Sequence, residues 1–157
     1  MKKFLSLLVL MTALSSCEED IKFNNPAVQG FKNNELWKAE DFTATVGADM
    51  SLTVVANNGF ETLTLHTTSL NAGAYTLGEN SENVAAFEFD ADGILEEYST
   101  DDALGGGKIV ISADPRETDF TKGYITGRFT FLALDSAGNE LSFQNGYFYK
   151  VPITPVP

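Results

Sequence analysis

The stretch Ser51-Leu-Thr-Val-Val-Ala-Asn-Asn-Gly-Phe-Glu-Thr-Leu-Thr-Leu65 decides the fold class of this chain. Apolar and polar residues alternate in 51–55 and again in 62–65, on both sides of Asn57-Asn58-Gly59. Successive side chains of a β-strand point to opposite faces, which produces this period of two. Asn-Gly is also a preferred turn between hairpin strands. The stretch therefore predicts a β-hairpin with one buried face.

The same alternation recurs through the rest of the chain. Residues 85–90 alternate before a turn at Asp90-Ala91-Asp92-Gly93, and residues 123–133 are followed by a turn and a return strand that runs to Val151. No stretch keeps a 3.6-residue period over three turns. We expect an all-β protein: an antiparallel β-sandwich or flattened barrel of about nine to ten short strands, joined mostly as meander hairpins. The glycine run 105–107 is expected to be a loop.

Gly146 lies inside the last expected strand. A glycine in a strand often marks a β-bulge, where one extra residue shifts the alternation that follows. A bulge at Asn145-Gly146 would turn Phe148 toward the core. It would leave Tyr147 and Tyr149, two residues apart, on the opposite face.

The N-terminus predicts export. Lys2 and Lys3 precede an apolar run over 4–14, which is too short to span a membrane and typical of a signal peptide. Leu14-Ser15-Ser16-Cys17 resembles the lipobox of bacterial lipoproteins, which implies that Cys17 becomes an acylated first residue carrying diacylglycerol and an acyl chain such as palmitate. Two or more acyl chains anchor a protein stably. We expect a signal peptide over 1–16, the lipidated Cys17 and a flexible tether over 17–26, one β domain over 27–153 and a tail over 154–157.

Composition limits the partners. The chain carries 10 basic and 22 acidic side chains, a formal net charge of −12. Nucleic-acid binding needs basic surface, so no nucleic-acid partner is expected. The acidic run Glu18-Glu19-Asp20 resembles the surface-export signal of Bacteroidota lipoproteins. We therefore expect a lipid-anchored protein of the outer membrane, with surface exposure favoured over the periplasmic side.

Few residues indicate catalysis. His66 is the only histidine and is out of phase with Leu63 and Leu65, which places it on the solvent face of a strand. Asp90 and Asp92 form a weak calcium candidate, but Gly93 stands at the fourth loop position and not at the sixth, where an EF-hand needs it. We expect no catalytic residues, no cofactor and no established metal site. A carboxylate-based hydrolase is the least favoured interpretation.

The aromatic residues are the remaining candidates for a site. Exposed tyrosines anchor partner proteins or contact sugars because each has an apolar ring and a polar tip. Tyr147, Tyr149 and Tyr124 are the candidate ligand-binding residues. Core or edge packing is the alternative for each of them, and above all for Trp37.

A resemblance supports this interpretation. The lipobox, residues 30–39 (Gly-Phe-Lys-Asn-Asn-Glu-Leu-Trp-Lys-Ala), residues 123–131 (Gly-Tyr-Ile-Thr-Gly-Arg-Phe-Thr-Phe) and residues 145–148 (Asn-Gly-Tyr-Phe) are similar to those of a group of small flavobacterial lipoproteins of unknown function. The resemblance implies a β architecture and carries no catalytic residues. We expect a non-enzymatic, membrane-anchored module that binds a protein or a glycan at the cell envelope. The alternative is an accessory subunit or a small inhibitor in an envelope assembly.

Overall fold

A computed structural model describes residues 27–154. The predicted signal peptide, Cys17 and the predicted tether lie outside the described residues. Residues 27–154 contain no helix that could cross a membrane. They form eleven strands: β1 (Val28–Lys32), β2 (Glu35–Lys38), β3 (Asp41–Val46), β4 (Leu52–Asn58), β5 (Glu61–Thr67), β6 (Gly73–Gly78), β7 (Val84–Ala91), β8 (Ile94–Ser99), β9 (Gly106–Ile111), β10 (Tyr124–Leu134) and β11 (Glu140–Thr154).

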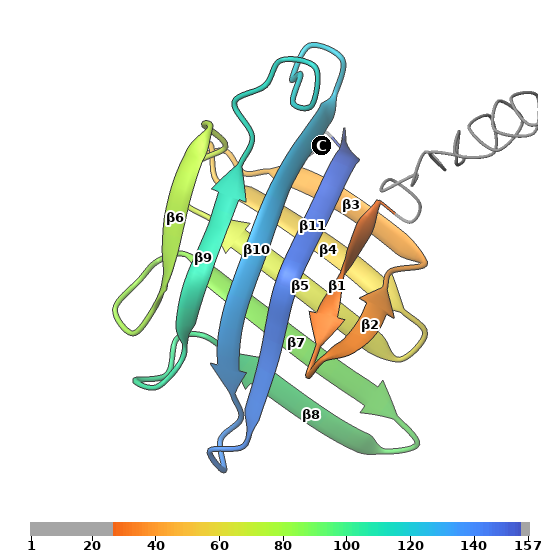
Figure 1. Cartoon of the computed structure of the whole chain (residues 1–157), viewed down its shortest axis with the longest axis vertical. Helices are drawn as coiled ribbons and strands as arrows, with labels where there is room; N and C mark the ends of the chain where they lie inside the picture. Colours follow the sequence, from red (N-terminus) through yellow and green to blue (C-terminus); the bar gives the residue numbers. More distant parts are fainter. Residues whose placement is uncertain (1–26, 155–157) are drawn as a thin grey trace, which may run out of the picture.

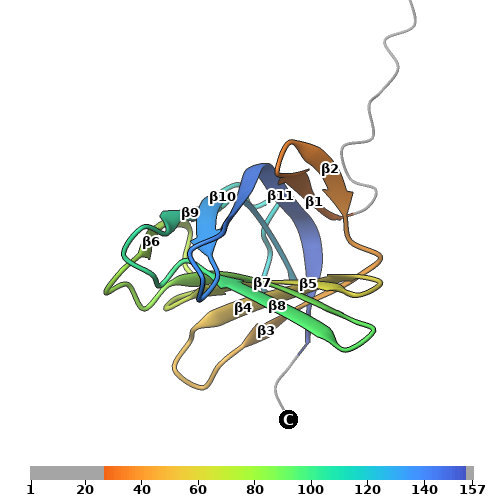
Figure 2. The ribbon, with the colours of Figure 1, turned by 90° about the horizontal axis from the view of Figure 1, so that it is seen from below.

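The strands form one continuous sheet that is folded into two layers (Figures 1 and 2). The front layer has the strand order β2-β1-β11-β10-β9-β6, and the back layer has the order β3-β4-β5-β7-β8. Two links join the layers at their edges. β11 continues into a short parallel pairing with β3, and Leu134 of β10 pairs with Ser99 of β8. The all-β prediction is confirmed, with eleven strands instead of nine or ten.

The predicted hairpin is β4–β5, with its turn one residue later than expected. Asn58 pairs with Glu61, so Gly59 and Phe60 form the two-residue turn. Gly59 has a φ of 59°, the left-handed conformation that such turns require at their first position. The connections are less meander-like than predicted because β5 pairs with β7, and β6 crosses to pair with β9 in the other layer.

Two boundaries also differ from the prediction. Gly106 and Gly107 belong to β9 and are not part of a loop. A Cβ atom at Gly107 would lie 2.1 Å from the carbonyl oxygen of Thr130, so the strand can pair closely with β10 only through a glycine. β11 extends to Thr154 because its last residues pair with β3, so Pro152 lies within a strand.

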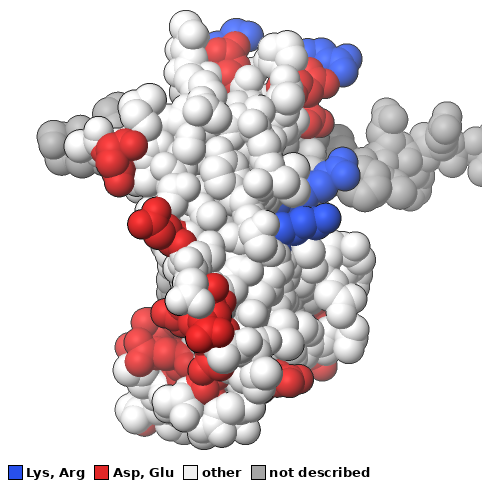
Figure 3. Space-filling view, turned by 90° about the vertical axis from the view of Figure 1, so that its left-hand side faces the viewer, with Lys and Arg blue, Asp and Glu red and all other residues white. Residues whose placement is uncertain are grey.

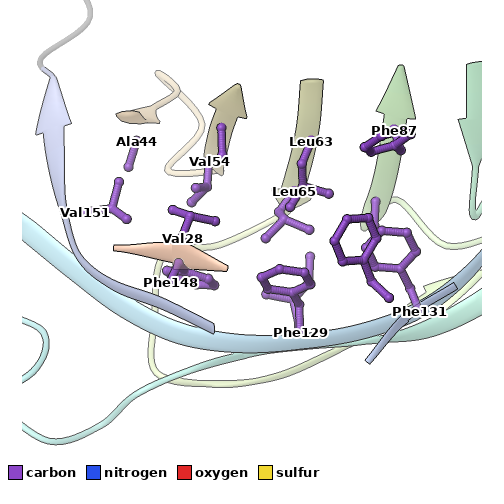
Figure 4. Packing of buried hydrophobic residues seen from close by; sticks show 14 of the residues in the cluster. Val28, Ala44, Val54, Leu63, Leu65, Phe87, Phe129, Phe131, Phe148 and Val151 are labelled. Atoms are coloured by element: carbon purple, nitrogen blue, oxygen red, sulfur yellow. The ribbon is translucent and has the colours of Figure 1, made fainter. Parts of the chain in front are cut away.

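The core fills the space between the layers. Leu63 and Phe87 of the back layer face Phe129 and Phe131 of the front layer (Figure 4). Phe143 is fully buried, with its ring centroid 5.1 Å from that of Phe131. The Trp37 ring meets Phe143 edge to face and is only 3% exposed, which confirms the core-packing alternative for this residue. No buried side-chain nitrogen or oxygen among the described residues lacks a hydrogen-bond partner.

Candidate functional site

The outer face of the front layer carries a groove of about 1490 Å³ that crosses β2, β1, β11, β10 and β9. Alternation along the strands places its side chains: Trp37 points into the core, so its neighbours Leu36 and Lys38 point outward. Leu36 is 55% exposed, and Phe31, its partner on β1, is 41% exposed. Val110 and Leu132 supply apolar surface at the far side of the groove.

Strand pairing aligns one row of outward-facing residues across the groove. Lys38 pairs with Gln29, Gln29 with Tyr147, Tyr147 with Arg128, and Arg128 with Val110. These five residues come from five strands and lie as much as 118 positions apart in the sequence. The fold therefore places Lys38 on one side of Gln29 and Tyr147, and Arg128 on the other side.

The cations of this face are unusual in so acidic a chain. The lysines and arginines of residues 27–154 number seven, and three of them pair with carboxylates: Lys32 with Glu61, Arg116 with Asp114, and Lys122 with Asp119. Within the described part of the chain, the four without a carboxylate partner all lie on the front layer. They are Lys38, Lys108, Arg128 and Lys150. The first three line the groove, and no aspartate or glutamate of residues 27–154 does so.

The space-filling view shows the same separation of charge (Figure 3). Acidic side chains gather at the lower end of the molecule, where β7 and β8 lie. Basic side chains stand out on the side of the front layer. An anionic ligand would therefore meet attraction at the groove and repulsion over the opposite part of the surface.

The three candidate tyrosines come together beside this groove. The rings of Tyr147 and Tyr149 stack with centroids 5.9 Å apart and an angle of 19° between their planes. Arg128 lies over Tyr147 at 5.9 Å, and Lys150 lies over Tyr149 at 5.3 Å and over Tyr124 at 5.2 Å. The expectation that Tyr147 and Tyr149 share a face is confirmed. Because these two rings face one another, they offer ring edges and hydroxyl groups to a ligand more than open ring faces.

The hydroxyl groups of these tyrosines are available. Tyr75 donates its hydroxyl hydrogen to the carbonyl oxygen of Asn71, and Tyr98 donates to Glu96. Among the described residues, Tyr124, Tyr147 and Tyr149 have no such partner. Burial raises the pKa of Tyr147, as does the nearby carboxylate of Glu117, while Arg128 opposes the rise. Tyr147 therefore stays protonated and able to donate a hydrogen bond well above neutral pH.

Two bulges in β11 position this cluster. The pairing with β10 shifts register between Phe129 and Phe131, opposite Asn145, which has a left-handed φ of 49°. Phe148 is fully buried as a result, which confirms the predicted bulge. A second shift, opposite Thr126, leaves Lys150 as the extra residue with a φ of 46°. The hydroxyl of Thr126 accepts the backbone N–H of Lys150 at 2.8 Å and donates to the carbonyl oxygen of Glu117.

The acidic candidates lie elsewhere. Asp92 and Gly93, with φ of 52° and 81°, form the two-residue turn between β7 and β8, where both residues need a left-handed conformation. Asp90 pairs with Leu95 in the adjoining strands. No group of three or more His, Cys, Asp and Glu residues in 27–154 is arranged to hold a metal ion. The calcium candidate thus serves the geometry of a turn.

His66 lies on the back layer, away from the groove. Its Nδ1 atom is 3.0 Å from Oγ1 of Thr53, its partner on β4. Asp49, the nearby acid, accepts a hydrogen bond from the hydroxyl of Ser51 at 2.6 Å. A nucleophile–histidine–acid chain would require the carboxylate to orient the imidazole, and here the carboxylate is bonded to a serine.

Sequence reasoning found the tyrosines and missed the four cations. Lysines and arginines are common on solvent faces, and these four are isolated in the sequence. Two features of the sequence could have indicated them. Basic residues are few in this acidic chain, and these four fall at strand positions whose side chains point outward. Strand order was also needed to bring them together.

A family model described as a domain of unknown function (DUF6252) matches residues 24–152. No curated protein matches the chain. No solved structure matches it either.

Proposed function

The chain belongs to the DUF6252 family of domains of unknown function, and we propose that it is a non-enzymatic binding module that holds an acidic glycan in the groove of the front layer. One observation carries the proposal. Lys38, Lys108 and Arg128 line a groove to which no carboxylate of residues 27–154 contributes, in a chain with a net charge of −12. Arg and Lys in such a setting attract carboxylate or sulfate groups through charge-assisted hydrogen bonds.

The neutral residues of the groove favour a glycan over a protein partner. Gln144 and Asn145 bring amide groups to the lining, and the Tyr147 hydroxyl adds a donor. Amides and phenols can both donate to and accept from the many hydroxyl groups of a sugar chain. Phe31 and Leu36 give an apolar edge for the less polar side of sugar rings.

The lining also supports a binding role instead of catalysis. Among residues 27–154, no Asp, Glu, His or Cys lines the groove. These side chains supply most general acids, general bases and covalent nucleophiles. The charged groups of the lining, one guanidinium and two ammonium groups, can hold an anion through charge-assisted hydrogen bonds.

A location at the cell envelope fits this role. The proposed lipid on Cys17 would hold the domain close to the membrane. Gln29, which lines the groove, follows the proposed tether by only three residues. We propose that the protein is an outer-membrane lipoprotein that displays the groove to envelope or external glycans.

A role as an accessory subunit is favoured by a different surface. Phe60, Ile94 and Leu95 are all more than half exposed at the turns of the back layer. Exposed apolar groups of this kind occur at protein–protein contacts. Cross-linking in intact cells tests this role: a single partner lost from an Ile94→Glu/Leu95→Glu variant would favour it over glycan binding.

The glycan proposal is tested with ligands that share one backbone. Isothermal titration calorimetry of residues 18–157 would compare carboxymethyl dextran, dextran sulfate and neutral dextran. We expect binding to the two charged polymers only. Each charge-assisted contact contributes about 1.5–3 kcal/mol, so Arg128→Gln and Lys108→Gln should each weaken binding by roughly tenfold or more.

The matched control is Arg116→Gln, which removes a positive charge that lies outside the groove and already pairs with Asp114. It should leave the affinity nearly unchanged. Equal binding of neutral dextran, or equal losses from Arg116→Gln and Arg128→Gln, would reject the proposed site.

The anchor is tested separately. Metabolic labelling with an alkyne-bearing palmitate, followed by membrane fractionation, would compare the chain with a Cys17→Ala variant. We expect label and membrane association for the first and neither for the second. Protease treatment of intact cells then distinguishes surface display, in which the domain is digested, from the periplasmic side, in which it survives.

A further inference from the structure

The geometry points to an extended polyanion as the ligand, with charges that run diagonally across β9, β10 and β11 and with Lys150 as the last contact. This inference rests on the proposed glycan-binding function and adds the form of the ligand. It distinguishes a chain with repeated negative charges from a single charged sugar or a small anion. It also assigns a binding role to Lys150, which lies outside the lining of the groove.

The diagonal follows from the strand register. Lys108 on β9 pairs with Thr130, Arg128 lies two residues from Thr130 on the same face of β10, and Lys150 on β11 lies opposite Thr126. Each step therefore advances two residues along the strands, about 6.6 Å, and one strand across, about 4.8 Å. The three cation-bearing positions are thus spaced by roughly 8 Å.

Tyrosines occupy the interval between Arg128 and Lys150. Arg128 lies over Tyr147, Tyr147 stacks on Tyr149, and Lys150 lies over Tyr149. Lys150 is thereby held close to the protein surface although it lacks a carboxylate partner among the described residues. A ligand that contacts both cations must also pass the two hydroxyl groups of this stack.

The backbone at Lys150 supports a functional role. A φ of 46° is uncommon for any residue other than glycine, and asparagine is the usual exception. Unusual conformations of this kind often occur at binding sites, where surrounding structure maintains them. Here the buried Thr126 accepts the Lys150 N–H and fixes the bulge. The bulge directs the Lys150 side chain to the outer face, next to Tyr149.

The spacing of the cations selects among polyanions. A nucleic-acid strand carries one charge about every 3.4 Å, much more densely than cations roughly 8 Å apart can match. The acidic remainder of the molecule would also repel so dense a charge. A polysaccharide with carboxylates or sulfates at wider intervals fits the three positions better.

Glu117 is a carboxylate whose charge reaches the diagonal formed by Lys108, Arg128 and Lys150, because it acts on Tyr147. Its side chain accepts a hydrogen bond from Ser112 at 2.7 Å, and its charge acts on Tyr147. It would repel a passing anion, so Glu117→Gln should strengthen the binding of a long ligand. Substitutions that neutralise Lys108, Arg128 or Lys150 should instead weaken the binding of this ligand.

The test is the dependence of affinity on ligand length. Calorimetry with galacturonate, its trimer and its hexamer would be run on the chain, on Lys150→Asn and on Lys150→Arg. Asparagine tolerates the left-handed conformation and removes the charge, whereas arginine keeps the charge. We expect the hexamer to bind the chain at least tenfold more tightly than the monomer. Lys150→Asn should lose most of that gain without changing the weak binding of the monomer, and Lys150→Arg should retain it.

The control is Lys122→Gln, a neutralised lysine of the β9–β10 loop that pairs with Asp119. Its hexamer affinity and its thermal midpoint should match those of the unmodified chain. If monomer and hexamer bind with equal affinity, or if Lys150→Asn and Lys122→Gln bind the hexamer equally well, the ligand does not extend along Lys108, Arg128 and Lys150. Glycan binding in the groove would then still stand. If neither the hexamer nor dextran sulfate binds, the proposed function itself is wrong. Tighter binding of a single-stranded oligonucleotide would replace the glycan with a nucleic acid.

Discussion

At the level of single residues, two glycines in neighbouring strands make room for two phenylalanine rings. Gly127 pairs with Phe148 and Gly146 pairs with Phe129 across β10 and β11. A Cβ atom on Gly146 would lie 2.4 Å from the Phe129 ring, and one on Gly127 would lie 2.2 Å from the Phe148 ring. Both rings lie flat against the backbone beneath the groove. The inner side of this sheet is therefore filled while its outer side stays open for a ligand.

This arrangement predicts a strong effect of Gly146→Ala. The three atoms nearest to the added methyl group all belong to the Phe129 ring, and overpacking of this kind costs about 1–3 kcal/mol in the free energy of unfolding. Phe129→Leu should therefore cost less in the Gly146→Ala background than alone, which a double-mutant cycle by urea denaturation would show. Gly106→Ala is the control because its Cβ atom would lie 3.5 Å from the nearest atom. Strict additivity of the two substitutions would contradict this packing.

The pKa of Asp114 provides a second prediction. Arg116 binds this carboxylate through three side-chain hydrogen bonds of 2.6, 3.0 and 3.2 Å, and the pKa of Asp114 falls from 3.8 to about 2. A lowered folded-state pKa stabilises the fold above the unfolded value, and this contribution disappears as the pH falls through about 2. Arg116→Gln should raise the pKa of Asp114 toward 3.8, as measured by NMR titration of the carboxyl carbon.

The Arg116→Gln variant should not reach the ordinary value. The backbone N–H of Arg116 also donates to Asp114, at 2.9 Å, and this bond does not depend on the side chain. An unchanged pKa in the variant would show that the ion pair is absent in solution.

At the level of elements, the β1–β2 hairpin forms one wall of the groove. β2 is an edge strand and pairs only with β1. Glu61 of β5 links this hairpin to the back layer, because its carboxylate accepts from the indole Nε1 of Trp37 at 2.7 Å and also binds the ammonium of Lys32. The position of Lys38 in the groove thus depends on a contact made through the core side of its own strand.

Glu61→Ala should therefore destabilise the protein more than Glu61→Gln. Alanine leaves the N–H of the buried Trp37 and the ammonium of Lys32 without their partner, at a cost of about 1–3 kcal/mol, whereas glutamine keeps an acceptor for the indole. Urea denaturation followed by tryptophan fluorescence measures both, since Trp37 is the only tryptophan. Equal losses from the two variants would mean that the ion pair with Lys32 carries the whole contribution.

The same elements show how far sequence reasoning extends. The β4–β5 hairpin and the bulge before Phe148 were predicted because alternation and glycine are local signals. The start of β9 was missed because the need for Gly107 comes from the Thr130 carbonyl on another strand. The crossing of β6 to β9 was also missed, since nothing near either strand specifies a distant partner. The two-residue period of a strand predicted that Tyr147 and Tyr149 share a face. The position of Arg128 beside them could be known only from the pairing of β10 with β11.

At the level of the whole molecule, the charge of the groove and the charge of the protein have opposite signs. The chain has 22 acidic and 10 basic side chains, yet the charged residues of 27–154 that line the groove are all cations. A second hollow of about 380 Å³, on the back layer, is lined by acids that include Glu88, Glu97 and Asp102. The proposed anionic glycan is therefore expected to bind at the front layer and to be repelled at the back layer.

This opposition predicts an uncommon dependence on salt. At about 0.01 M salt the screening length is about 30 Å, so an approaching polyanion responds to the net negative charge. At about 0.15 M it is about 8 Å, so the ligand responds to the nearby cations alone. The association rate constant for carboxymethyl dextran should therefore rise with salt over this range, as measured by stopped-flow fluorescence, whereas a basic protein shows a fall. The combined variant Glu88→Gln/Glu97→Gln/Asp102→Asn should reduce the rise because it removes acidic charge far from the groove. A rate that falls steadily with salt in both proteins would mean that the cations dominate at every distance, and the acidic surface would then have no part in orienting the ligand.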